Sequence, residues 1–182
     1  MKFESTFIEG LAVISPKKIE DERGYFLESF KKAEFENFIG REIDFLQENE
    51  SCSKAGTIRG LHFQNPPFAQ GKLVRVTKGR VLDVAVDIRE GSPTYGMHFA
   101  IELSAENGKQ LWIPEGFAHG FAALEEGSVL SYKCTDVYNK SSEGSLLWSD
   151  PDLGIEWGVE DPLVSEKDMA SLKLAGFETR FG

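Results

Sequence analysis

The sequence has few of the residues that build metal sites and disulfide frameworks. Among its 182 residues it contains three histidines and two cysteines, Cys52 and Cys134. No Cys-x-x-Cys motif is present, which argues against a zinc site of the usual kind. The His-x-His pair that many metal-binding β-barrels use is also missing. We therefore expect no metal and no other cofactor, and two free thiols in a reducing compartment.

Long apolar runs and an excess of basic residues are missing as well. Because the longest apolar stretches are short, we expect no membrane span. The N-terminal segment carries acids where a signal peptide needs an apolar run, so we expect a cytoplasmic location. Lysine and arginine number 20 against 30 acids, a formal net charge of −10. A nucleic-acid-binding protein would show a basic face, so we expect no nucleic-acid partner. A single nucleotide as ligand stays open, because its pocket needs only a few basic residues.

The apolar residues that are present recur with a period of two. Leu82, Val84, Val86 and Ile88 share one face of a predicted strand. Shorter runs show the same pattern, separated mostly by glycine-containing turns: Tyr25–Phe30, Ile58–Phe63, Lys72–Thr77, His98–Leu103, Gln110–Ile113, His119–Leu124 and Val129–Val137. Short strands at this spacing predict a β-sandwich or barrel.

Helix signals are confined to the margins. One predicted helix spans Lys31–Ile39 and ends at Gly40, and another spans Met169–Leu174. The spacing of Ser165 and Asp168 before the second helix resembles a capping box. No linker, repeat or low-complexity segment interrupts the chain, so we expect one domain over residues 1–182. A cupin-type jelly-roll barrel with a few short peripheral helices fits this pattern and can hold a small ligand.

His62 is the strongest candidate for chemistry. Arg59, Gln64, Gln70 and Lys72 lie within ten residues of it, and a barrel core has little reason to collect so many polar groups.

Other candidates are weak when taken singly. His119 lies between Ala118 and Gly120, and a lone histidine on a strand is more often part of the core. Asp21–Glu28 reads as a charged turn that leads into a strand, and Gln47–Asn49 carries little signal alone. Tyr132 falls in the middle of a strand, where a tyrosine usually belongs to the core.

Taken together, the motifs resemble the dTDP-4-dehydrorhamnose 3,5-epimerase family. Arg-Gly-Leu-His followed by Pro-x-Gly-x-Ala-His-Gly-Phe is a specific pair. The matching stretches cover nearly the whole chain in the family's order: Asp21–Glu28, Gln47–Ser53, Gly56–Gln64, Gln70–Val74, Gly79–Arg89, Ile113–Phe121 and Asp152–Trp157.

The resemblance implies a metal-free cupin that acts as a homodimeric isomerase. The family epimerises dTDP-4-dehydro-6-deoxy-D-glucose at ring carbons 3 and 5 to dTDP-4-dehydro-L-rhamnose. This reaction belongs to dTDP-L-rhamnose biosynthesis and so to cell-surface polysaccharide formation. The ketone acidifies the hydrogens on both neighbouring carbons. A base removes each proton to give an enolate, and an acid returns a proton from the opposite face.

The resemblance also implies the catalytic roles. His62 would be the base, because a histidine side chain titrates near neutral pH. Asp168 would orient the imidazole, and Tyr132 would be the acid on the other face. Lys72 would stabilise the enolate oxygen, with help from His119.

The implied binding residues recognise the nucleotide. Arg23 and Arg59 would hold the diphosphate. Phe26 and Glu28 would meet the thymine end, and the resemblance allows them to reach in from a partner subunit. The remaining implied contacts are Gln47, Asn49, Glu143 and Lys167.

Two other functions stay open at this point. A relative that epimerises a single carbon of a related 4-keto-6-deoxy sugar nucleotide would use the same base and acid. A non-catalytic cupin that only binds a sugar nucleotide would have lost His62, Tyr132 or Asp168, and all three residues are present.

Overall fold

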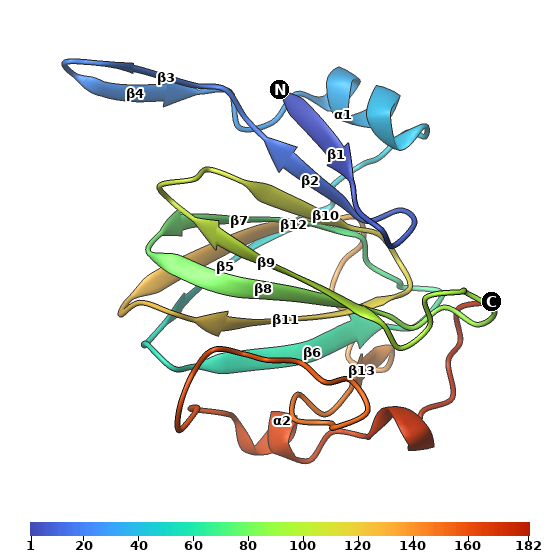
Figure 1. Cartoon of the computed structure of the whole chain (residues 1–182). Helices are drawn as coiled ribbons and strands as arrows, with labels where there is room; N and C mark the ends of the chain where they lie inside the picture. Colours follow the sequence, from blue (N-terminus) through green and yellow to red (C-terminus); the bar gives the residue numbers. More distant parts are fainter.

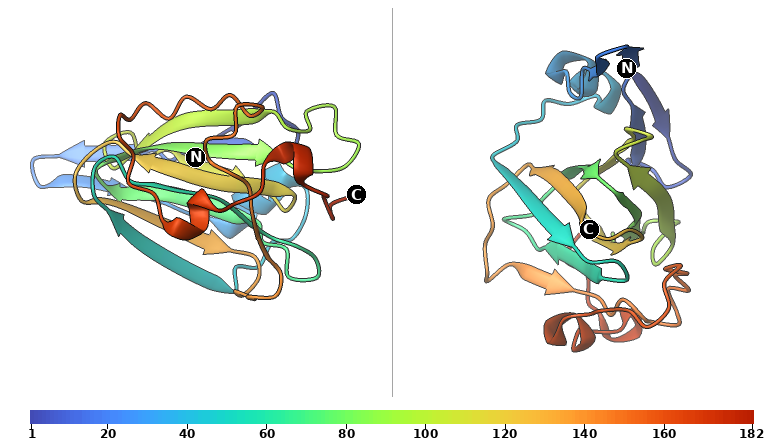
Figure 2. Two further views of the ribbon diagram at one scale, coloured as in Figure 1. Left: turned by 90° about the horizontal axis from the view of Figure 1, so that it is seen from below. Right: turned by 90° about the vertical axis from the view of Figure 1, so that its left-hand side faces the viewer.

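The computed structural model describes all 182 residues, and two facing β-sheets form its body (Figure 1). One sheet has the strand order β1-β2-β10-β7-β12-β5 and the other β13-β6-β11-β8-β9. In the end-on view of Figure 2 the two sheets stand as opposite walls of a flattened barrel. The strands are β1 (Lys2–Ser5), β2 (Ala12–Ser15), β5 (Gln47–Ser53), β6 (Ile58–Gln64), β7 (Lys72–Lys78), β8 (Arg80–Asp87), β9 (His98–Ser104), β10 (Gln110–Ile113), β11 (Phe117–Ala123), β12 (Ser128–Cys134) and β13 (Glu143–Ser145). The predicted cupin-type jelly roll is confirmed.

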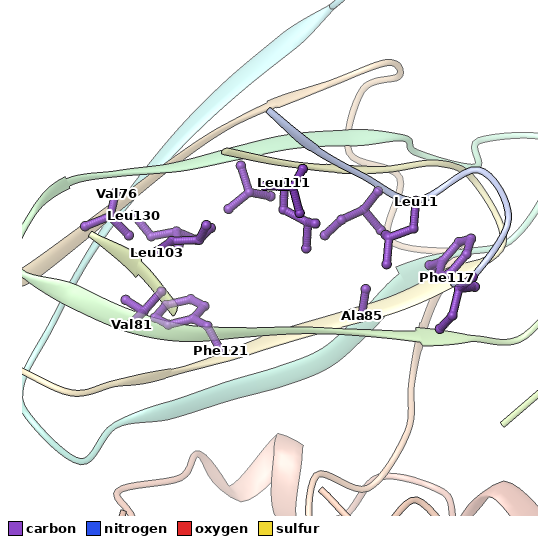
Figure 3. Packing of buried hydrophobic residues seen from close by; sticks show 13 residues of the cluster. Leu11, Val76, Val81, Ala85, Leu103, Leu111, Phe117, Phe121 and Leu130 are labelled. Atoms are coloured by element: carbon purple, nitrogen blue, oxygen red, sulfur yellow. The ribbon is translucent and has the colours of Figure 1, made fainter. Parts of the chain in front are cut away.

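Strand β8 is buried on both faces and separates two hydrophobic clusters. Val84 and Val86 pack beneath the barrel with the C-terminal segment, as the period-two pattern predicts. Val81 and Ala85 point the other way, into the space between the sheets, where they pack with Phe121 and residues of the opposite wall (Figure 3). Because both faces are covered, this strand reads as an almost continuous apolar run.

The C-terminal segment crosses the outer face of the five-stranded sheet (Figure 2). Helix α2 (Glu166–Met169) begins after Ser165, whose hydroxyl accepts a hydrogen bond from the Asp168 N–H at 3.1 Å, so the predicted cap is confirmed. The predicted helix over Met169–Leu174 is wrong. Leu172 instead forms a β-bridge with Leu146, which requires extended backbone there. Only a short 3-10 turn, η1 (Leu174–Gly176), follows.

The N-terminal part carries one helix and a hairpin that stands away from the barrel (Figure 1). Helix α1 (Lys32–Ile39) ends at Gly40, which adopts a left-handed φ of 80°, as predicted. Strands β3 (Lys18–Asp21) and β4 (Gly24–Leu27) form a separate two-stranded sheet. The strand predicted over Tyr25–Phe30 therefore ends earlier, at Leu27. No helix in the structure has the length and apolar character needed to cross a membrane.

Candidate active site

A close approach of two strands places the two candidate histidines side by side. His62 on β6 and His119 on β11 are register partners, and the register shifts just beyond them. Gly60 has a φ of +135°, and a Cβ atom there would lie 2.5 Å from the Cα of Gly120. Glycine at position 60 is therefore required for the two backbones to meet, and this contact fixes where the two imidazoles stand.

His62 and Asp168 form a hydrogen-bonded pair. The His62 Nε2 lies 2.6 Å from Asp168 Oδ1, and the carboxylate is almost fully buried. The Gly60 N–H also donates to Asp168 Oδ2 at 3.4 Å. Burial alone would raise the pKa of the Asp168 carboxyl, but these hydrogen bonds and the His62 charge leave it lowered. The ionised carboxylate thus fixes Nε2 of the imidazole, while Nδ1 makes no hydrogen bond within the chain.

Tyr132 faces this pair from the opposite wall. It lies on β12 of the six-stranded sheet, whereas His62 lies on β6 of the five-stranded sheet. Both side chains line the same cavity. Burial raises the pKa of the Tyr132 hydroxyl, so the phenol stays protonated at neutral pH.

Lys72 adds a cation to the interior of the cavity. The residue is only 8% exposed, and its Nζ donates to the His62 carbonyl at 3.4 Å. Burial lowers the pKa of Lys72, while the neighbouring Cys134 and Asp83 oppose that shift. Because this amine makes one long hydrogen bond within the chain, it has donors left for a ligand oxygen.

His119 has a buried carboxylate partner that the sequence analysis missed. Its Nε2 lies 3.0 and 3.1 Å from the two carboxylate oxygens of Asp83, which has no exposed surface. Burial lowers the pKa of His119, and Asp83 acts in the opposite direction. The sequence did hold a signal: an aspartate inside the apolar run Val-Leu-Asp-Val-Ala-Val must be paired when buried.

These groups line a cavity of about 520 Å³. Its wall consists of Ser51, Thr57, Ile58, Arg59, His62, Lys72, His119, Gly120, Phe121, Leu130, Tyr132, Leu163, Val164, Ser165, Lys167 and Asp168. A smaller polar extension of about 160 Å³ shares His62, Lys72 and Tyr132. It adds Gln47, Asn49, Phe63, Gln64, Gln70, Tyr138 and Glu143.

Polar residues at the edge of the cavity and its extension, here called the polar rim, contact one another: Arg59, Ser53, Lys167, Glu143, Gln47 and Asn49. Arg59 donates from Nε to Ser53 Oγ at 3.1 Å. Lys167 forms an ion pair with Glu143. Burial acts to raise the pKa of the Glu143 carboxyl, but Lys167, the Tyr138 hydroxyl and His62 together leave the pKa lowered. Gln47 donates to Asn49 Oδ1 at 2.9 Å.

Three predicted binding residues lie away from this cavity within the chain. Arg23 sits at the tip of the β3–β4 hairpin, where its guanidinium donates to Asp21 at 2.6 Å. Phe26, on β4, is 69% exposed. Glu28 follows the hairpin and is exposed as well. The other predicted residues all line the cavity or its extension.

The arrangement defines a class of protein: a jelly-roll barrel in which a histidine–carboxylate pair faces a tyrosine across one cavity, a constellation suited to proton transfer at carbon. No group of three or more His, Cys, Asp or Glu side chains is placed to hold a metal ion.

The chain belongs to the dTDP-4-dehydrorhamnose 3,5-epimerase family, whose sequence profile matches residues 5–176. It is 53% identical to the dTDP-4-dehydrorhamnose 3,5-epimerase of Salmonella typhimurium, with 91% of each chain covered. Identity to the Shigella flexneri protein of the same name is 50%, with 95% of this chain and 96% of that one covered.

A solved structure has the same fold. It is a dTDP-6-deoxy-D-glucose-3,5-epimerase from Legionella pneumophila in complex with dTDP-4-keto-L-rhamnose. It superposes with a TM-score of 0.93 at 46% identity, and the match covers 97% of this chain and 94% of that one.

Proposed function

We propose that this isomerase converts dTDP-4-dehydro-6-deoxy-D-glucose to dTDP-4-dehydro-L-rhamnose by inverting carbons 3 and 5, within dTDP-L-rhamnose biosynthesis. The observation that carries the proposal is the placement of the His62–Asp168 pair and Tyr132 on opposite walls of one cavity. Inversion needs a proton removed on one face of a ring carbon and another delivered on the opposite face. The names of the close relatives agree with this chemistry.

His62 is the proposed base. Its Nδ1 takes the proton from the carbon beside the ketone, and the electrons of the broken C–H bond move to the ketone oxygen to give an enolate. Asp168 stabilises the imidazolium that forms, through the hydrogen bond to Nε2. The imidazolium then gives its proton to solvent.

Lys72 supports the enolate oxygen, and His119 lines the same cavity. Donors that are already in place when charge develops on an oxygen contribute about 2–4 kcal/mol in comparable sites. Tyr132 then gives its phenolic proton to the carbon from the other face, and the phenolate regains a proton from solvent. The cycle closes without any change of oxidation state, and it repeats at the second carbon.

The rim binds the nucleotide. Arg59 offers a guanidinium to the diphosphate. Gln47, Asn49 and the Glu143–Lys167 pair supply donors and acceptors around the polar extension. An acidic protein can hold this anionic ligand because Arg59, Lys72 and Lys167 line the cavity.

A homodimer would complete the site. The hairpin carries Arg23 and Phe26 away from their own cavity and leaves Ile19 and Tyr25 more than half exposed. An isolated two-stranded hairpin is at best marginally stable in water. A second copy that receives the hairpin would cover these apolar side chains and bring Arg23, Phe26 and Glu28 to the partner's nucleotide.

We further propose that residues 1–182 act as one catalytic domain in the cytoplasm. The C-terminal segment supplies Asp168 to a cavity that the barrel forms, so neither part would be competent alone. Both cysteines are free thiols, as suits a reducing compartment.

Proton NMR in deuterium oxide tests the activity. With dTDP-4-dehydro-6-deoxy-D-glucose as substrate, deuterium should enter at both C3 and C5, and the product should have the L-rhamno configuration. Deuterium at one carbon only would identify a single-carbon epimerase, which the same base and acid also allow. No exchange at either carbon would leave only binding of the sugar nucleotide.

A further inference from the structure

Strand β5 has a polar inner face, and one residue on it has no role in the chemistry above. Gln47 and Asn49 line the polar extension, Ser51 lines the main cavity, and Ser53 holds Arg59. The residues between them are exposed on the outer face. A strand that faces a barrel interior ordinarily places apolar side chains there, so this pattern indicates that β5 faces a ligand.

The hydroxyl of Ser51 is an unpaired polar group in this wall. Its Oγ is buried and has no hydrogen-bond partner in the chain. Its register partner on β12 is Leu130, which belongs to the hydrophobic core and offers no polar atom. Buried hydroxyls are nearly always paired, so an orphan beside a binding cavity points to a partner that arrives with the ligand.

The neighbours of Ser51 indicate which part of the ligand it meets. Asn49, two residues away in one direction, is the register partner of the proposed acid Tyr132. Ser53, two residues away in the other direction, accepts from Arg59. Side chains two residues apart on a strand stand about 6.5–7 Å apart. Ser51 therefore lies between the reacting sugar ring and the guanidinium proposed to hold the diphosphate.

We propose that the Ser51 hydroxyl donates a hydrogen bond to a diphosphate oxygen of the sugar nucleotide, next to the oxygen that Arg59 binds. The inference rests on the proposed function. Arg59 uses Nε and Nη2 for Ser53 Oγ and the Cys52 carbonyl, which leaves Nη1 for the same diphosphate. A hydrogen bond to an anionic oxygen is stronger than one between neutral groups.

Calorimetric titration with dTDP tests the contact without requiring turnover. Ser51→Ala should raise the Kd for dTDP about tenfold and the KM for the sugar nucleotide similarly, with kcat changed less than about twofold. Ser51→Thr retains a hydroxyl and should bind dTDP nearly as tightly as the parental protein. Ser131→Ala is the matched control, since its hydroxyl lies in the neighbouring strand on the outer face, near Glu48; its Kd should be unchanged.

Thermal unfolding without ligand separates binding from a structural role. Because the Ser51 hydroxyl is unpaired, Ser51→Ala should keep the parental Tm or raise it by up to about 3 °C. A lowered Tm together with an unchanged Kd for dTDP would overturn the proposal.

Two further outcomes are also decisive. A raised KM for the sugar nucleotide with an unchanged Kd for dTDP would place the hydroxyl on the sugar and refute the diphosphate contact. A parental protein that binds no dTDP would refute the proposed function itself, whatever Ser51→Ala does.

Discussion

Asp168 reaches His62 from more than a hundred residues further along the chain, and its charge is what the proposed mechanism uses. Asp168→Asn keeps the shape but removes the negative charge beside the imidazolium. We expect kcat to fall about a hundredfold or more, with little change in the circular dichroism spectrum. Deuterium exchange into the substrate should fall equally, because proton removal is the affected step. An Asp168→Asn protein with parental activity would remove Asp168 from the mechanism.

The same residue gives a pH-dependent stability. Folding lowers the pKa of Asp168, so its carboxylate stabilises the native state above the unfolded carboxyl pKa of about 4. This contribution is lost as the pH falls through the lowered native pKa. The Tm difference between the parental protein and Asp168→Asn should therefore be largest at neutral pH and shrink towards pH 3.

Tyr132→Phe should separate proton removal from proton delivery. The variant keeps the ring and its packing but loses the transferable proton on that wall of the cavity. His62 can then return a proton only to the face from which it came. In deuterium oxide, substrate should still exchange while the yield of inverted product falls tenfold or more. If Tyr132→Phe formed the L-sugar at the parental rate, the acid would have to be another group, with His119 or water next.

Single residues were predictable from the sequence to different degrees. The site around His62 and Lys72 could be predicted from the local sequence, because so many polar side chains are not expected in the apolar core of a barrel. Asp168 was assigned only through the family resemblance, since no local pattern tells which distant carboxylate folds back. Asp83 was missed because its apolar neighbours made the strand look complete.

At the scale of elements, the contact between β6 and β11 positions both imidazoles. Gly60→Ala would place a Cβ atom 2.5 Å from the Gly120 Cα and 2.9 Å from the His119 carbonyl oxygen. We expect a loss of about 2 kcal/mol or more in unfolding free energy and a fall in kcat. Gly154→Ala is the control, because that glycine also has a positive φ but has no atom within 4 Å of the added carbon. Chemical denaturation should show a much smaller loss there; equal losses would contradict the steric argument.

The strands that carry His62, Lys72, His119 and Tyr132 were predictable from their apolar positions, whereas strand β5 was not. The strand at Gln47–Ser53 escaped prediction because its inner positions are polar, which is the property that makes it a wall of the cavity. The predicted helix after Met169 failed for a different reason. Leu172 has good helical propensity, but its backbone forms a β-bridge with Leu146, just after β13. This tertiary contact overrides the local propensity.

At the scale of the whole molecule, the cavity holds two histidine–carboxylate pairs and no cluster that could ligate a metal. Each imidazole is already engaged by its own carboxylate, Asp168 or Asp83. Dialysis against a strong chelator should therefore leave the epimerase activity unchanged. Loss of activity that one particular metal ion restores would contradict this prediction.

The proposed binding residues of the β3–β4 hairpin, Arg23 and Phe26, face solvent in the single chain. If Arg23 serves the cavity of a second copy, the intact site contains His62 from one subunit and Arg23 from the other. His62→Ala and Arg23→Glu should each be weakly active at low substrate concentration. The first variant lacks the proposed base, and the second lacks a proposed contact to the diphosphate. Mixed and refolded together, they should form heterodimers in which one site carries both native residues.

Random pairing of the two variants makes about half of the dimers heterodimers, each with one intact site, so about a quarter of the parental activity should return. Light scattering should show dimers for the parental protein and for both variants. Mixing His62→Ala with Asp168→Asn is the control, since both residues belong to the same subunit's cavity. That mixture should recover nothing, because no pairing reunites the two native residues. Activity of the first mixture equal to the sum of its parts, or a monomeric parental protein, would show that the hairpin does not complete a neighbouring site.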